Sequence, residues 1–166
     1  MQPRPSAHQH ARAWLGALLL LAACASSEPE PVPFEPLNVP AAPNFASGDY
    51  VFTTAAAWST AWLAAPQQFH ADPFNLQHVP LPAVDFSVHT VVGVSLGVGT
   101  RCFVPRITAV LRDGDTLEVQ YRSNADTGVV TLACAHPWSL AVFAKVPALG
   151  GDLRSVRFVR RVDTEA

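Results

Sequence analysis

The pattern of apolar and polar positions predicts a mainly β fold. Most of the second half of the chain reads as short segments, apolar or alternating apolar and polar, and β-branched residues are frequent in them. The predicted strands are residues 50–53, 90–96, 103–111, 116–122, 128–134, 138–146 and 155–162. Residues 112–115 contain an Asp-Gly pair, which tolerates positive φ and is typical of a hairpin turn.

One segment has the pattern of a helix instead. Residues 54–65 are rich in alanine, start with Thr54 and stop before Pro66. Trp58 and Trp62 lie four positions apart and share one helix face, so we expect them to anchor the helix on a sheet. A ligand platform is the alternative role for this pair. The predicted fold class is α+β, mainly β: an antiparallel sheet, or a small β-sandwich or barrel, with one packed helix.

The N-terminal segment reads as an export signal. Arg4 and Arg12 precede an apolar run over residues 13–23, which is shorter than the roughly 20 residues of a membrane span. The run ends in Leu-Ala-Ala-Cys at residues 21–24 and resembles the lipobox of bacterial lipoproteins. This resemblance implies that residues 1–23 are a lipoprotein signal peptide and that Cys24 is the lipidation site. Cleavage by an ordinary signal peptidase is the alternative.

The same resemblance implies a location, and the proline content after Cys24 predicts a tether. The protein is expected to be lipid-anchored in the bacterial cell envelope, and Ala25 after the cysteine favours the outer membrane. Residues 25–43 contain six of the 15 prolines. Proline-rich segments favour extended polyproline II at about 3.1 Å per residue, so residues 24–43 are expected to form a tether with a reach of roughly 60 Å. A single globular domain is expected over residues 44–166.

The composition argues against two classes of function. The chain has 166 residues, of which 49% are hydrophobic and 14% charged, and much of the apolar excess lies in the signal. The chain from Cys24 onward has nine basic and 13 acidic residues, a net charge of −4. This balance argues against a generally basic nucleic-acid binder. The envelope lacks ATP and the sequence has no glycine-rich phosphate loop, which argues against a nucleotide-dependent enzyme.

Cys102 and Cys134 are the two cysteines that remain after lipidation. Both lie next to predicted strands, and the envelope is oxidising, so we expect them to form a disulfide. Closure of a loop of about 33 residues would stabilise the fold by roughly 3.5 to 4 kcal/mol. Free buried thiols are the alternative, since the C-x-x-C spacing of redox proteins is absent.

Two apparent catalytic features lack the context they need. Ser95 lies in a G-x-S-x-G match over residues 93–97, but a nucleophile elbow requires a following helix, and residues 98–105 contain glycines, β-branched residues and a proline. His70, Asp72 and His78 have no zinc-ligand spacing. We therefore expect no catalytic residues, metal or cofactor, and we interpret Asp85 as a turn residue.

Four arginines cluster near the C-terminus: Arg154, Arg157, Arg160 and Arg161. In a strand, Arg157 and Arg161 share one face, while Val156 and Phe158 lie on the other face with Arg160. This pattern predicts an edge strand whose charges discourage pairing with another chain. A surface for an acidic partner is the alternative.

Residues 81–97 read LPAVDFSVHTVVGVSLG, in which a hydrophobic Asp-Phe-Ser turn leads into an apolar strand that ends in glycine. With the Thr54-x-x-x-Trp58 helix and the His136-Pro137-Trp138 segment before Lys145, this stretch resembles the PrcB-type family over residues 50–160. The family is named for a lipoprotein subunit of a surface protease complex, a noncatalytic partner of the protease. After Gly97 the sequence departs from the family's Arg, Thr and Gly-Gly-Tyr-like turn.

The expected function is therefore a noncatalytic, lipid-anchored envelope domain that binds an envelope or secreted protein, for which the resemblance suggests a protease. The expected contact residues lie in a loop after Gly97: Val98, Gly99, Thr100, Arg101 and Phe103. One alternative is a small-ligand or glycan binder with a pocket lined by Trp138, Phe143 or Tyr121. A serine hydrolase that uses Ser95 is another.

Overall fold

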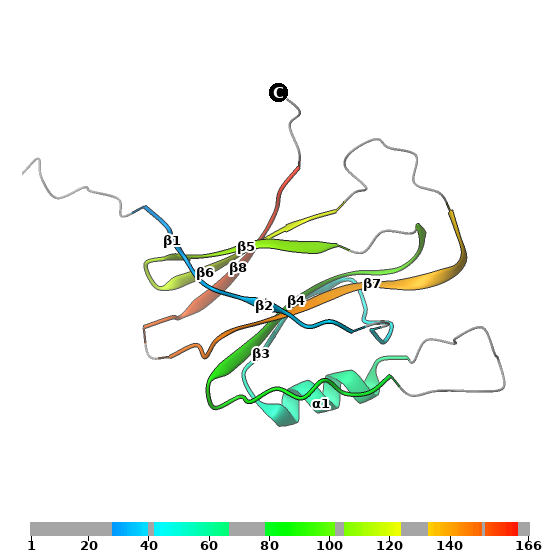
Figure 1. Ribbon diagram of the computed structural model, residues 1–166, viewed down its shortest axis with the longest axis horizontal. Coiled ribbons are helices and arrows are strands. Elements are labelled where there is room, and N and C mark those ends of the chain that lie inside the picture. The colour runs from blue at the N-terminus through cyan, green and yellow to red at the C-terminus, as the bar shows by residue number, and fades with distance from the viewer. Residues whose placement is uncertain are drawn as a thin grey trace, which may run out of the picture.

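The computed structural model describes residues 28–39, 42–66, 79–101, 105–123, 133–150 and 152–162. Within these ranges the chain forms two four-stranded sheets and one helix (Figure 1). Sheet A has the order β1 (Glu30–Pro31), β5 (Arg106–Asp113), β6 (Thr116–Arg122) and β8 (Ser155–Arg160). Sheet B has the order β2 (Glu35–Pro36), β7 (Ala133–Pro147), β4 (His89–Arg101) and β3 (Gly48–Phe52). The α+β, mainly β class is confirmed as two open sheets with one packed helix.

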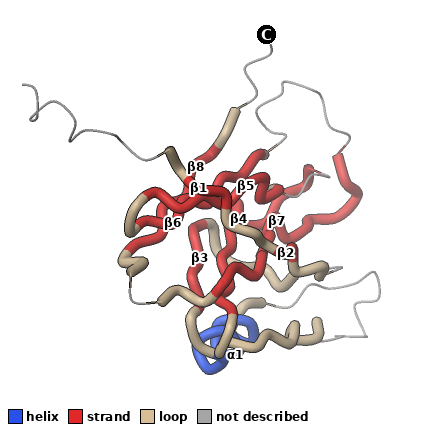
Figure 2. Tube along the Cα trace, turned by 60° about the vertical axis from the view of Figure 1, so that its left-hand side comes forward, coloured by secondary structure: helices blue, strands red, loops and turns tan. Residues whose placement is uncertain are grey.

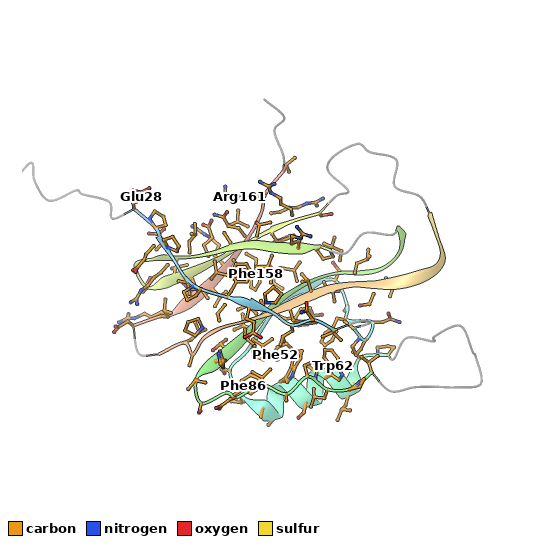
Figure 3. All side chains as sticks on the ribbon, in the orientation of Figure 1. Glu28, Phe52, Trp62, Phe86, Phe158 and Arg161 are labelled. Carbon is orange, nitrogen blue, oxygen red and sulfur yellow. The ribbon has the colours of Figure 1, made fainter. Side chains whose placement is uncertain are left out.

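The molecule has three layers, with sheet B in the middle (Figure 2). The helix α1 (Ala55–Ala64) covers the face of sheet B that points away from sheet A. On β4, Val92 packs between the two sheets, while the neighbouring Val91 packs toward α1. A strand in a middle layer is buried on both faces, which explains the near-continuous apolar run of residues 90–96. In Figure 3, Phe158 lies between the sheets, and Trp62 lies on the helix α1.

The helix forms as its sequence predicts. The Thr54 hydroxyl accepts a hydrogen bond from the Ala57 backbone N–H at 3.2 Å, which caps the first turn. Trp58 and Trp62 are almost fully buried, and their indole Nε1–H groups donate to the carbonyl oxygens of Pro82 and Val79 at 3.2 and 3.0 Å. Both tryptophans are therefore core anchors, and they join α1 to residues 79–82, which run beside it.

The β5–β6 hairpin is also confirmed. Asp113 pairs with Thr116, and Gly114 at the turn has φ of +61°, which favours glycine. β8 is an edge strand as expected, but it pairs with β6 in parallel. The chain reaches sheet A beside the hairpin turn, where the Arg154 N–H donates to the Asp115 carbonyl oxygen at 2.7 Å. β8 therefore starts at the same end as β6 and runs in the same direction.

Two strands are longer than predicted. β4 continues past Leu96 to Arg101, and β7 runs unbroken over Ala133–Pro147, where two strands were predicted. The two strands pair with each other along most of their length, so each supplies the hydrogen-bonding partner that local sequence does not reveal. Pro137 lies where the ladder with β4 shifts register, between the pairs Gly99–Trp138 and Arg101–Ala133, and proline is tolerated at such irregular positions of a strand. Residues 128–132 lie outside the described ranges.

The structure corrects the prediction that residues 24–43 form a free tether. Residues 28–39 and 42–47, here called the strap, run along both sheets: Glu30 pairs with Arg112 of β5, and Glu35 pairs with Lys145 of β7. The apolar side chains between the prolines pack into the two cores: Val32 and Phe34 between the sheets, and Leu37, Val39 and Ala42 on the α1 side. The folded unit therefore extends back at least to Glu28 instead of starting at residue 44. Residues 1–27, including Cys24, lie outside the described residues.

Candidate functional site

Ser95 holds the strap where it crosses sheet B. The side chain is buried, and its hydroxyl donates to the Phe45 carbonyl oxygen at 3.0 Å and accepts from the Gly97 N–H at 3.0 Å. Ser139 on the neighbouring strand donates to the Pro43 carbonyl oxygen at 2.7 Å. Both hydroxyls therefore satisfy backbone groups of the crossing strap. Ser95 has the environment of a structural serine instead of an exposed nucleophile.

Beyond this crossing, β4 and β7 are the two strands of sheet B that continue among the described residues. We call residues 97–101 of β4 and 133–139 of β7 the distal ribbon; Val98 pairs with Ser139, and Gly99 with Trp138. β3 begins at Gly48, opposite Ser95, so no described strand pairs with the other side of β4 from Val98 onward. The ladder shifts register between Ser95 and Val98, and Gly97 has φ of +82°, where glycine is favoured. The β4 side of the ribbon is thus an edge that no described strand pairs with, and we call it the open edge.

The expected contact residues have a different backbone from the one predicted. Val98, Gly99, Thr100 and Arg101 form the end of β4 and not a loop, because β7 extends far enough to pair with them. Val98 is 52% exposed. Phe103 and Cys102 lie outside the described residues, as does the side chain of Cys134. Arg101 and Ala133, their sequence neighbours, are register partners, and the disulfide stays a prediction.

An apolar concavity of about 580 Å³ lies beside this open edge. Its walls come from the strap, β3, the C-terminal half of α1 and β4. They are formed by Asn44, Phe45, Ala46, Tyr50, Ala61, Ala64, Ala65, Pro66, Gly97 and Val98. The alanines of α1 make room, because the helix presents methyl groups where longer side chains would fill the space. A run of small residues in the sequence was the available signal, but helix propensity alone also explains it.

The concavity carries little polarity. None of its lining residues bears a formal charge. The Tyr50 hydroxyl donates to the Ala46 carbonyl oxygen at 2.7 Å, and burial raises the pKa of Tyr50, so the phenol stays neutral. The Oδ1 atom of Asn44 is buried and has no hydrogen-bond partner among the described residues. The site therefore combines an edge of β4 that no described strand pairs with and an apolar wall, which suits an extended peptide.

The residues named for the alternative ligand pocket lie in different sheets: Phe143 on β7 of sheet B and Tyr121 on β6 of sheet A. Phe143 is 1% exposed and belongs to an aromatic cluster between sheet B and α1, with ring centroids 4.9 Å from Phe45 and 5.2 Å from Trp58. Tyr121 lies on β6 in sheet A, opposite Ile107. The structure therefore does not bring Phe143 and Tyr121 together. The side chain of Trp138 lies outside the described residues.

The remaining candidates have structural or undetermined roles. Asp85 is a turn residue as expected: its Oδ1 accepts from the Ser87 N–H at 2.9 Å and from the Ser87 hydroxyl at 2.6 Å, and these bonds lower the pKa of Asp85. His70, Asp72 and His78 lie outside the described residues. Among the side chains that are described, no group of three or more His, Cys, Asp or Glu could hold a metal ion.

The C-terminal arginines have a partner that the sequence did not reveal. Glu118 on β6 is 7% exposed, and its carboxylate accepts hydrogen bonds from Arg157, from Arg161 at 3.0 Å and from Gln120 at 2.7 Å. Burial alone would raise the pKa of Glu118, but these hydrogen bonds and the two positive charges outweigh it and lower the pKa. The arginines therefore clamp the edge strand β8 to β6. An alternating strand predicts that Glu118 faces solvent, so sequence alone gave no signal.

Comparison with protein-family models, curated proteins and solved structures found no match to this chain. Among the described residues, no helix has the length and apolar character needed to cross a membrane.

Proposed function

We propose that this chain is a noncatalytic, lipid-anchored domain of the bacterial envelope that binds a protein partner at the distal ribbon. The observation that carries the proposal is the open edge of β4 beside the apolar concavity. A partner segment in extended conformation would pair its main chain with β4 and place alternate side chains against the alanines of α1. Strand addition of this kind obtains affinity from the main chain and specificity from the pockets beside it.

The two edges of the ribbon differ in a way that favours β4. Pro137 removes one N–H group from β7, whereas residues 97–101 of β4 keep all of theirs. Proline is a common means of protecting an edge from pairing. The Gly97-Val98-Gly99 sequence also leaves little side chain in the way of an approaching strand. We therefore place the partner on the β4 side of the ribbon.

The lipid anchor would be close to the folded domain. Cys24 lies only six positions before Glu30, the first residue paired with sheet A, so an extended chain spans at most about 20 Å between them. Because the strap belongs to the fold, this is a third of the reach expected for a free tether. The start of β1 and the distal ribbon lie on opposite sides of the molecule in both ribbon and tube views (Figures 1 and 2). An anchored domain would therefore present the ribbon away from the lipid.

The resemblance of residues 81–97 to the PrcB-type family suggests an envelope or secreted protease as the partner. The departure from the family pattern begins at Val98, which is also where the open edge begins. If partner specificity resides in this edge, the partner of this chain differs from that of the family's namesake.

The proposed site is tested by one pair of matched variants. Val98→Asp puts a charge on the open edge, whereas Val88→Asp puts the same charge on a valine of similar exposure, 54% against 52%, in the turn before β4. Proteins that copurify from envelope extract after chemical crosslinking are compared by mass spectrometry. We expect the V98D variant to lose a protein that the wild type and V88D variant retain. Identical sets from all three chains would contradict the proposed site.

The anchor is tested separately. Cells that express the chain are grown with radiolabelled palmitate, and the protein is recovered from the membrane fraction. We expect label on the wild type and none on the Cys24→Ser variant. Label on neither chain would remove the lipid anchor from the proposal without affecting the binding site.

A further inference from the structure

A second cavity lies under the strap. This strap groove has a volume of about 590 Å³, within the range of small-ligand sites. Its apolar walls include Phe34, Leu37 and Val39 of the strap, Ile107 of β5 and Val142 of β7. The groove exists because the strap pairs with β7 only around Glu35 and Pro36 before it leaves the edge of the sheet. Three elements thus surround this groove, whose lining combines apolar side chains with polar surface.

The rim of the groove carries a positive charge. Arg106 lines it, is exposed, and makes no ion pair or side-chain hydrogen bond with any part of the chain that the structure describes. Arg122 is its register partner on β6, so two arginines occupy directly opposite positions at this end of sheet A. An anion at this rim would therefore be stabilised by the charge of Arg106.

We propose that the strap groove binds a single-chain amphiphile with an anionic head, of which a fatty-acid carboxylate is the simplest example. The apolar chain would lie between Phe34, Val39, Ile107 and Val142, and the carboxylate would meet the Arg106 guanidinium, whose planar fork of donors matches it. The proposal does not depend on the partner site, because the two cavities share no lining residue.

The test is calorimetric titration of the mature chain, residues 24–166, with Cys24→Ser so that no acyl chain is attached. The ligands are dodecanoate, decanoate, dodecanol and dodecyltrimethylammonium, each below its aggregation concentration. We expect dodecanoate to bind at least tenfold more tightly than dodecanol, and the ammonium compound to bind least. Decanoate should bind up to about 14-fold more weakly than dodecanoate, since each buried methylene contributes about 0.8 kcal/mol.

Three variants connect the binding to the groove. Arg106→Gln should raise the Kd of dodecanoate to that of dodecanol. Arg154 is an exposed arginine at the opposite end of sheet A, and Arg154→Gln should leave the Kd of both ligands unchanged. Asn38→Trp places a large ring at the exposed rim and should abolish binding of both ligands. Circular dichroism checks that each variant is folded. If the N38W variant is not folded, the R106Q result alone tests the site.

Equal affinities for dodecanoate and dodecanol would contradict the proposal that the ligand has an anionic head. An unchanged Kd for dodecanoate in the R106Q variant would contradict the proposed site. Phosphatidylglycerol vesicles form the third arm, because they present anionic heads on two-chain lipids. Vesicles should not displace dodecanoate. Displacement would show that this surface binds a membrane instead of a single-chain ligand.

Discussion

The Ser139 hydroxyl donates to the carbonyl oxygen of Pro43 at 2.7 Å, and this bond joins residues 96 positions apart in the chain. It lies at the point where the strap crosses sheet B, next to the equivalent bond from Ser95 to Phe45. The crossing separates the three-layered body of the molecule from the distal ribbon. It therefore sets where β3 can begin and where the edge of β4 becomes open.

Ser139→Ala should destabilise the fold by about 1–2 kcal/mol, because the buried carbonyl oxygen of Pro43 loses its donor. The measurement is the midpoint of urea unfolding. Ser59→Ala is the matched control: the Ser59 hydroxyl also donates to a backbone carbonyl, but in a more exposed place on α1. If both alanine variants shift the midpoint equally, the crossing has no special role in stability.

The packing of the strap in both cores leads to a prediction about truncated chains. A chain that begins at Glu28 should unfold cooperatively, whereas one that begins at Asn44 should not, because it lacks Phe34, Leu37 and Val39 from the two cores. Thermal unfolding by circular dichroism distinguishes the two. Cooperative unfolding of the shorter chain near the same temperature would mean that residues 28–43 are a tether after all.

Gly93→Ala should destabilise the protein by about 3 kcal/mol. A Cβ at this position would overlap the ring of Phe143 and lie 2.9 Å from the Val142 carbonyl oxygen, and neither group can move in the packed middle layer. Gly150→Ala is the control, since a Cβ there meets no atom within 4 Å. Urea unfolding of both variants gives the comparison, and similar midpoints would show that the Phe143 packing adapts.

The buried carboxylate of Glu118 predicts an asymmetry between its partners. Glu118→Gln should cost about 1–2 kcal/mol at pH 7, because Arg157 and Arg161 are half exposed and solvent then solvates them. Replacement of both arginines by alanine should cost more, about 3 kcal/mol, because it removes both positive charges from a buried carboxylate and leaves it the neutral Gln120 amide as a donor. Urea unfolding at pH 7 tests the order of the two losses, and the reverse order would contradict this account.

The same group predicts a dependence on pH. The folded-state pKa of Glu118 lies below the ordinary value of 4.5, so its contribution is complete above that pH and is lost as the pH falls through the folded-state pKa. The difference in unfolding free energy between wild type and Glu118→Gln should therefore shrink below about pH 4.5. A difference that stays constant down to pH 3 would falsify the assignment.

The disulfide gives a chemical prediction. Alkylation of the unreduced mature protein under denaturing conditions should label neither Cys102 nor Cys134, and both should react after reduction. Mass spectrometry of peptides identifies the labelled sites. Labelling of both residues without reduction would exclude the bond, and the stabilisation of roughly 3.5 to 4 kcal/mol expected for it would be absent.

Local sequence signals predicted an element well where contacts among its own residues stabilise that element. The Thr54 cap, the paired tryptophans and the stop at Pro66 define α1 through contacts within a few residues. The Asp113-Gly114 turn fixes its hairpin for the same reason. The prolines of residues 25–43 misled, since proline composition indicates an extended chain and does not say what that chain lies against.

The sequence by itself determined the class of fold, the helix, most of the strands and the burial of Trp58 and Trp62, because periodicity and capping are local. Only the tertiary structure decided that the strap joins both sheets, that Glu118 binds Arg157 and Arg161, and that Val98 lies on an open strand edge. Each of these depends on which distant segments become neighbours. That choice is made by the packing of whole layers, and no short stretch of residues records it.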